Sequence, residues 1–189
     1  MRALLLAAPI LLAAVMGSAA EEPPSWKPFS SEEGQFRILL PDQPVVTHAS
    51  RSTFLGKIPQ TRHETLSGVG EVSIDHHDLP GIAIDMMPDS VILDQAGENL
   101  IEAVGGTQSL ERAYTWNGHA AREITYEVPG DTPMLERCRL ILVEARLYLV
   151  IANWPAPQAI PDQLVAFFDS FELMKAADPT APVGAGFAD

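Results

Sequence analysis

The sequence predicts a mixed α and β domain in which a central hairpin lies in the middle of a sheet, with helices or loops over both faces. Two apolar runs of strand length predict the hairpin, Leu140–Val143 and Leu147–Ala152. Neither run alternates between apolar and polar residues, so both sides of each strand need cover. A turn at Glu144-Ala145-Arg146 is expected to join them, and the segment Pro161–Leu173 is expected to supply part of the cover.

The strands before the hairpin are predicted from alternation and turn residues. Phe36, Ile38 and Leu40 alternate with their neighbours in one strand, which a Pro-Asp-Gln-Pro run ends. Two polar segments, Val45–Thr53 and Gln60–Leu66, are typical of strands at a sheet edge or in a half-exposed position. A further strand is expected at Glu71–Asp78, and the following Leu-Pro-Gly is expected to interrupt the chain.

Two helices and a second hairpin complete the expected elements. Helical spacing of apolar residues predicts a helix over Asp89–Val104, which two glycines stop. The Asn117-Gly118 pair favours a type I′ turn, so strands are expected on both sides of it. Pro161 is a favoured first residue for the last helix, whose apolar face includes Phe168 and Phe171.

The first twenty residues have the pattern of a secretory signal peptide. Arg2 precedes an apolar run of about 14 residues, which is short for a membrane span, and Ser18 and Ala20 suit the −3 and −1 positions of a cleavage site. We therefore expect a periplasmic or secreted protein without stable membrane insertion after cleavage. The expected layout is a signal peptide at 1–20, an extended segment at 21–28, a single domain at 29–174 and a disordered tail at 175–189.

The charge of the chain argues against two classes of binding partner, and its cysteine content argues against a disulfide. The chain has 12 Lys and Arg against 25 Asp and Glu, and its net charge of −13 argues against binding to nucleic acid or to anionic membrane surfaces. The one cysteine, Cys138, cannot form an intrachain disulfide, and we expect it to be a buried, inert thiol.

Four short signatures, in this order and spacing, resemble those of the PsbP-like family, which is named after an extrinsic subunit of photosystem II. They are G-x-F-x-(I/V)-x-x-P at Gly34–Pro41, G-x-x-(G/A)-R-E at Gly118–Glu123, R-L-Y-x-(L/V) at Arg146–Val150 and F-x-x-S-F at Phe167–Phe171. The resemblance implies an α+β fold, a three-layer α/β/α sandwich with a central, mainly antiparallel sheet. It also implies binding to other proteins rather than catalysis, since that is the shared theme of the family.

The most suggestive cluster for chemistry is Asp75-His76-His77-Asp78, because imidazole and carboxylate ligate zinc, manganese or copper. On a strand, Asp75 and His77 would face one way while His76 and Asp78 would face the other. A third ligand would have to come from elsewhere, such as Asp85 or His63. The alternative is a solvated strand end with adventitious metal affinity.

Other polar residues are better explained by structure than by catalysis. His63 and His119 could act as general acids or bases, but both are expected to be exposed, and no nucleophile with an evident base is found. Arg122-Glu123 and the Arg137/Arg139 pair could form ion pairs between strands or, alternatively, an anion-binding patch. We expect no enzymatic activity and no cofactor.

The sequence therefore predicts a monomeric, exported, non-catalytic domain that binds another envelope protein or a small ligand. The alternative from a different class is a metal-binding protein that uses Asp75, His76, His77 and Asp78.

Overall fold

The structure, a computed structural model, describes residues 25–53 and 56–174. The predicted signal peptide at 1–20, residues 21–24 of the predicted extended segment and the predicted tail at 175–189 lie outside these residues. Within the two described ranges, no helix is long and apolar enough to cross a membrane.

Strands dominate the described part of the chain. The first five strands are β1 (Lys27–Ser31), β2 (Phe36–Leu40), β3 (Val45–Thr53), β4 (Gly56–Ser67) and β5 (Gly70–Asp78). Two helices follow, α1 (Gly81–Met86) and α2 (Asp89–Ala103). The chain continues with β6 (Thr107–Trp116), β7 (His119–Val128), β8 (Met134–Val143), β9 (Arg146–Pro155), α3 (Asp162–Asp169) and β10 (Glu172–Leu173).

Seven strands form the main sheet, in the order β3-β4-β5-β9-β8-β7-β6, and all neighbours are antiparallel. The β8–β9 hairpin lies in the middle of this sheet, as its doubly apolar sequence predicts. Its turn is shorter than expected, because Arg146 already pairs with Val143. The turn is therefore Glu144-Ala145, and Glu144 has a φ of 53°.

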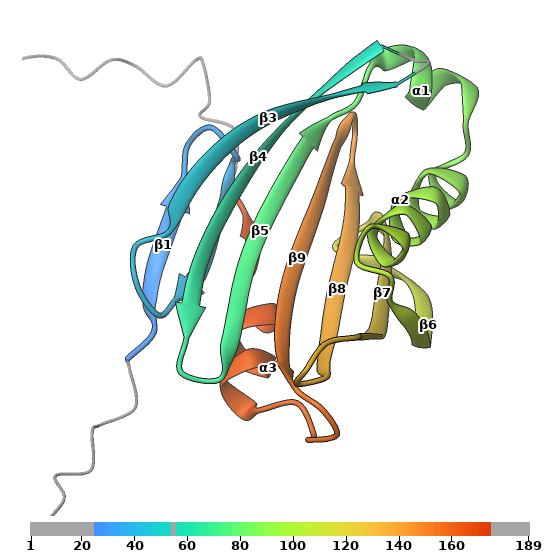
Figure 1. The fold of residues 1–189 in the computed structure, drawn as a ribbon. Coiled ribbons are helices and arrows are strands. Elements are labelled where there is room, and N and C mark those ends of the chain that lie inside the picture. Colours follow the sequence, from blue (N-terminus) through green and yellow to red (C-terminus); the bar gives the residue numbers. More distant parts are fainter. Residues whose placement is uncertain (1–24, 54–55, 175–189) are drawn as a thin grey trace, which may run out of the picture.

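The main sheet is covered on both faces (Figure 1). We call the face under α1 and α2 the helical face, and the opposite one, under α3 and the small sheet β1-β2-β10, the small-sheet face. The mainly antiparallel sheet between two covering layers confirms the predicted fold class. One outer layer differs from an α/β/α sandwich, because most of it is the small sheet, with α3 beside it.

Side chains of β8 point alternately into two separate cores, as predicted. Leu140 and Leu142 lie in the core under the helices, together with Ile92 and Leu93 of α2. Ile141 lies in the core under the small sheet. Cys138 is fully buried on the helical face and burial raises the pKa of its thiol, so the predicted buried and inert cysteine is confirmed.

Three elements differ from the prediction. The helix α3 ends at Asp169, so Phe171, which was expected on its apolar face, lies beyond it. The strand β1 starts at Lys27, inside the predicted 21–28 segment, and its polar sequence carries no strand pattern. The helix α1 occupies the region predicted to be an interruption, and Pro80 is its N-cap, with its carbonyl accepting from the Ala83 amide at 2.8 Å. The Asn117-Gly118 turn is confirmed, since both residues have positive φ.

Gly70, at the turn between β4 and β5, is required by a close backbone approach. A Cβ at this position would overlap the carbonyl oxygen of Asn153 on β9. We therefore expect Gly70→Ala to lower the free energy of unfolding in urea by about 1–3 kcal/mol. Gly68→Ala, two residues away, is the control, because nothing lies within 4 Å of its added Cβ. Equal stability of the two variants would contradict this account.

Candidate ligand-binding site

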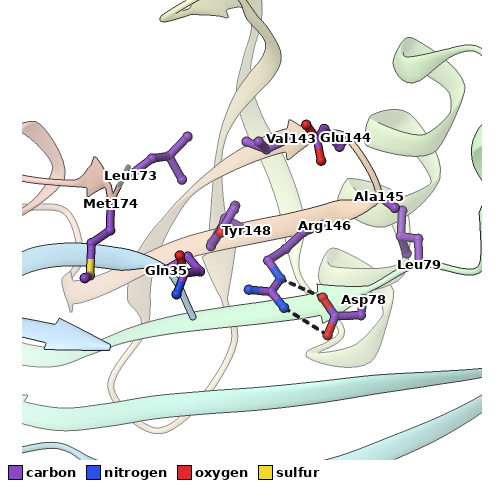
Figure 2. A pocket seen from close by; sticks show the side chains of 10 residues that line it. All are labelled: Gln35, Asp78, Leu79, Val143, Glu144, Ala145, Arg146, Tyr148, Leu173 and Met174. Carbon is purple, nitrogen blue, oxygen red and sulfur yellow. Dashed lines mark hydrogen bonds and ion pairs between the residues drawn. The ribbon is translucent and has the colours of Figure 1, made fainter. Parts of the chain in front are cut away.

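A cavity of about 430 Å³ opens where the β8–β9 turn, the end of β5 and the small sheet meet (Figure 2). Its lining is mixed. The apolar part is formed by Leu79, Val143, Ala145, Leu173 and Met174, and the polar part by Gln35, Asp78, Glu144, Arg146 and Tyr148. The volume lies within the range of small-molecule sites, although half of the lining residues are polar.

Arg146 is fixed at the cavity wall by two neighbours. Its Nε and Nη2 atoms donate to the two carboxylate oxygens of Asp78, at 2.6 and 3.1 Å, so the pair is bidentate (Figure 2). Its Nη1 donates to the carbonyl oxygen of Glu33 at 2.8 Å. The hydrogen bonds with Asp78 raise the pKa of Arg146 above its usual value. The guanidinium is thus permanently charged and oriented, and the Asp78 carboxylate beside it at the cavity balances its charge.

Two further hydrogen bonds join the main sheet and the residue after β10 to the loop between β1 and β2. The Tyr148 hydroxyl donates to the carbonyl oxygen of Gly34 at 2.8 Å, and burial raises the pKa of this hydroxyl. The Met174 amide donates to the carbonyl oxygen of Gln35 at 2.8 Å. The cavity therefore lies between elements that are joined by one side-chain and one backbone hydrogen bond.

Backbone strain gathers at the same cavity. The described residues include three non-glycine residues with positive φ, and two of them, Gln35 (54°) and Glu144 (53°), line the cavity. Such conformations cost about 1–3 kcal/mol each and are enriched at functional sites. All three lie in turns between paired strands: Gln35 between β1 and β2, Asn117 between β6 and β7, and Glu144 between β8 and β9. Glu144 lies in the turn expected from the sequence, and Gln35 is a variable position of the first family signature, whereas Arg146 and Tyr148 are fixed positions of the third.

The four predicted metal ligands divide between the two faces, as their strand spacing predicts. Asp75 and His77 are on the helical face, whereas His76 and Asp78 are on the small-sheet face, where Asp78 binds Arg146. In residues 25–53 and 56–174, no three His, Cys, Asp or Glu side chains are grouped so that they could hold a metal ion. The structure thus brings only Asp78 of the four to the cavity.

His63, expected to be exposed, is only 3% exposed, so that expectation is wrong. The small sheet covers it, and its Nε2 forms a 3.2 Å hydrogen bond with the Ser31 hydroxyl. Its ring also meets the ring of Phe36 edge-on, with centroids 5.2 Å apart, and lies 5.9 Å from the ring of His76. Burial lowers the pKa of both histidines. Although the sequence of β4 is polar, His63 on this strand packs with Phe36 and His76 in an aromatic layer between the two sheets.

A cluster with excess negative charge lies on the helical face of β4 and β5. Arg62 is its one guanidinium, 2.8 Å from Glu64, 3.1 Å from Glu71 and 3.7 Å from Asp75. Asp75 is 5% exposed, and its Oδ1 accepts no hydrogen bond from the described residues. Burial raises the pKa of Asp75 to about 6, against the opposing effect of Arg62, and burial also raises the pKa of Glu71.

The charges of the central strands form ion pairs between strands, which confirms the structural interpretation. Glu123 on β7 lies 2.7 Å from Arg139 on β8, 3.5 Å from Arg112 and 4.0 Å from Arg137. Arg139 also donates to the carbonyl oxygen of Phe168, which fastens α3 to the sheet. These arginines are therefore occupied by partners inside the domain.

The sequence matches no family model, and no curated protein matches it. Among solved structures, the chain is similar to the solution structure of cyanobacterial PsbP (CyanoP) from Synechocystis sp. PCC 6803. The TM-score is 0.50 and the identity 11%, over 85% of this chain and 99% of that one. The crystal structure of a protein of unknown function from Pseudomonas aeruginosa, titled a putative regulator, aligns with a TM-score of 0.41 and 12% identity, over 76% and 92%. The likeness to CyanoP confirms a PsbP-like fold and, at this identity, the fold alone.

Proposed function

From the PsbP-like fold, we propose that this chain is an exported, non-catalytic binding protein whose cavity holds a small ligand. The observation that carries the proposal is the cavity of about 430 Å³, with an oriented guanidinium, Arg146, at its wall. The mixed lining suits a ligand that has both an apolar part and a polar group.

The composition of residues 1–20 supports delivery to the periplasm or beyond, where the ligand would be met. The sequence also predicts an envelope protein as a possible partner. We propose that such a partner would bind a surface other than this cavity. The metal-binding alternative has less support, because Asp75 and His77 face away from His76 and Asp78. Stoichiometric metal that survives dialysis of the wild type and is lost in a His76→Ala/His77→Ala variant would favour that alternative.

The cavity proposal predicts that the mature protein, purified from the exported fraction, carries a bound small molecule. Native mass spectrometry should show a defined added mass that denaturation releases. Ala145→Phe places a ring in the cavity and is expected to lower the occupancy by about tenfold or more, since a filled site loses its contacts.

Ala103→Phe is the matched control, because Ala103 is an exposed residue at the end of α2. Its occupancy should equal that of the wild type, and both variants should unfold cooperatively. Equal occupancy in the two phenylalanine variants, or a wild type with no bound small molecule, would contradict the proposal.

A further inference from the structure

The strand β3 is an open edge of the main sheet. It pairs with β4 on one side, and no other described strand pairs with it. All of its side chains from Val45 to Arg51 are exposed, including Val45 at 67% and Val46 at 44%. Figure 1 shows β3 as the long outer strand, on the far side of the sheet from α2. An edge of this kind exposes unpaired backbone N–H and C=O groups.

The opposite edge, β6, is protected, whereas β3 is not. A register shift between Gln108 and Leu110 interrupts the β6 edge, and two exposed charged residues, Glu111 and Arg112, follow it. Bulges and charges of this kind block pairing with another chain. The register of β3 with β4 is unbroken, β3 contains no proline, and its one Lys or Arg is Arg51. The β6 edge is thus protected against pairing with another strand, whereas the β3 edge can accept one.

The outward backbone groups of β3 can be identified from Pro59. This residue lies opposite Ser50 in the register, and proline has no N–H to donate. The Ser50–Pro59 pair is therefore a non-hydrogen-bonded pair, and such pairs alternate with hydrogen-bonded ones along an antiparallel ladder. It follows that Val46, His48 and Ser50 direct their N–H and C=O groups away from β4, while Ala49 bonds to β4.

Carboxylates beside the β3 edge favour a basic strand as the one that pairs with it. Glu64 is directly opposite Val45 on the helical face, is 42% exposed, and belongs to the cluster in which Arg62 faces three carboxylates. On the small-sheet face, the exposed carboxylate of Glu33 lies 3.8 Å from His48. The carboxylates beside β3 would therefore attract Lys or Arg side chains on an added strand, while Arg51 is the one Lys or Arg on β3 itself. A second copy of this chain, with its net charge of −13, would be repelled.

We propose that an extended, basic segment of a partner protein pairs with β3 as an additional strand of the main sheet. Backbone hydrogen bonds to the outward groups supply affinity, and alternate basic side chains supply specificity. This surface is separate from the cavity, so it does not depend on a ligand there.

The test is amide hydrogen exchange by NMR on the mature protein at low salt, with a capped octapeptide of alternating Lys and Val as the probe. Exchange of the Val46, His48 and Ser50 amides should slow by about tenfold or more at saturation, since each gains a hydrogen bond. Amides of the β6 edge should not change. Protection at another surface, or none, would overturn the proposal. Protection of β3 that grows with protein concentration without peptide would overturn it in favour of self-pairing.

Two matched pairs of variants localise the effect. Ser50→Pro removes an outward N–H and should weaken peptide binding by about tenfold or more while the urea midpoint stays near that of the wild type. Ala49→Pro removes a bond to β4 and should lower the midpoint. Glu64→Gln should weaken binding about two- to fivefold, whereas Glu98→Gln, an exposed change of equal charge on α2, should not. Wild-type binding by Ser50→Pro would also overturn the proposal.

Discussion

Asp75→Asn is expected to raise the free energy of unfolding by about 3 kcal/mol at pH 8, the largest stabilisation we expect from one substitution in this chain. Burial raises the pKa of Asp75 from 3.8 to about 6 in the folded state. The folded protein therefore pays for a buried, ionised carboxylate above pH 6. Asparagine keeps the shape and removes the charge, while Arg62 keeps Glu64 and Glu71 as partners.

The sign of this effect reverses the usual behaviour of an ion-paired aspartate. A carboxyl whose folded pKa is raised contributes stability that is present below pH 3.8 and is lost as the pH rises through about 6. Urea unfolding of the two proteins should therefore differ at pH 8 and converge near pH 4. Asp85→Asn, at an exposed position on α1, should change stability by less than about 0.5 kcal/mol. A less stable Asp75→Asn at pH 8 would show that the carboxylate is net stabilising.

His77→Gln is expected to protect the fold against acid by about 2.5 kcal/mol at pH 4.5. Burial lowers the pKa of His77 from 6.5 to about 4, with His76 and Arg51 acting in the same direction. A histidine whose folded pKa is lowered contributes stability that is present above pH 6.5. This stability is lost as the pH falls from 6.5 to about 4. Glutamine does not titrate and so escapes the loss.

The measurement is urea unfolding of wild type and His77→Gln from pH 7.5 to pH 4.5. The gap between their free energies of unfolding should open in favour of the variant as the pH falls below 6.5. A constant gap over this range would show that His77 has the same pKa folded and unfolded. His63 and His76 also have lowered pKa values, so the variant should still lose stability in acid.

Much of the fold could be predicted because the main-sheet strands carry strong local signals. The β8–β9 runs are apolar on both sides, and the Asn117-Gly118 turn has few alternatives. The missed elements lack such signals. The strand β1 is defined by its pairing with β2, five residues away in the chain, and α1 is a six-residue helix with no side-chain cap.

The candidate site was less predictable, because it depends on contacts distant in sequence. Arg146 meets Asp78 across 68 residues, and Tyr148 meets Gly34 across 114. The positive φ of Gln35 and Glu144 has no marker in their residue types. The Asp75–Asp78 segment was predicted as a metal site. What distinguishes it in the structure is the buried carboxyl group of Asp75.

The cavity as a ligand site is tested most directly by ¹⁵N NMR of the mature protein, mixed with the small-molecule fraction of the compartment in which it resides. We predict that chemical-shift changes gather at the cavity, with Gln35, Ala145 and Arg146 among the amides that move most. The Ala145→Phe variant should show none of these changes. Shifts that gather on another surface, or that persist in Ala145→Phe, would contradict the assignment of this cavity as the binding site.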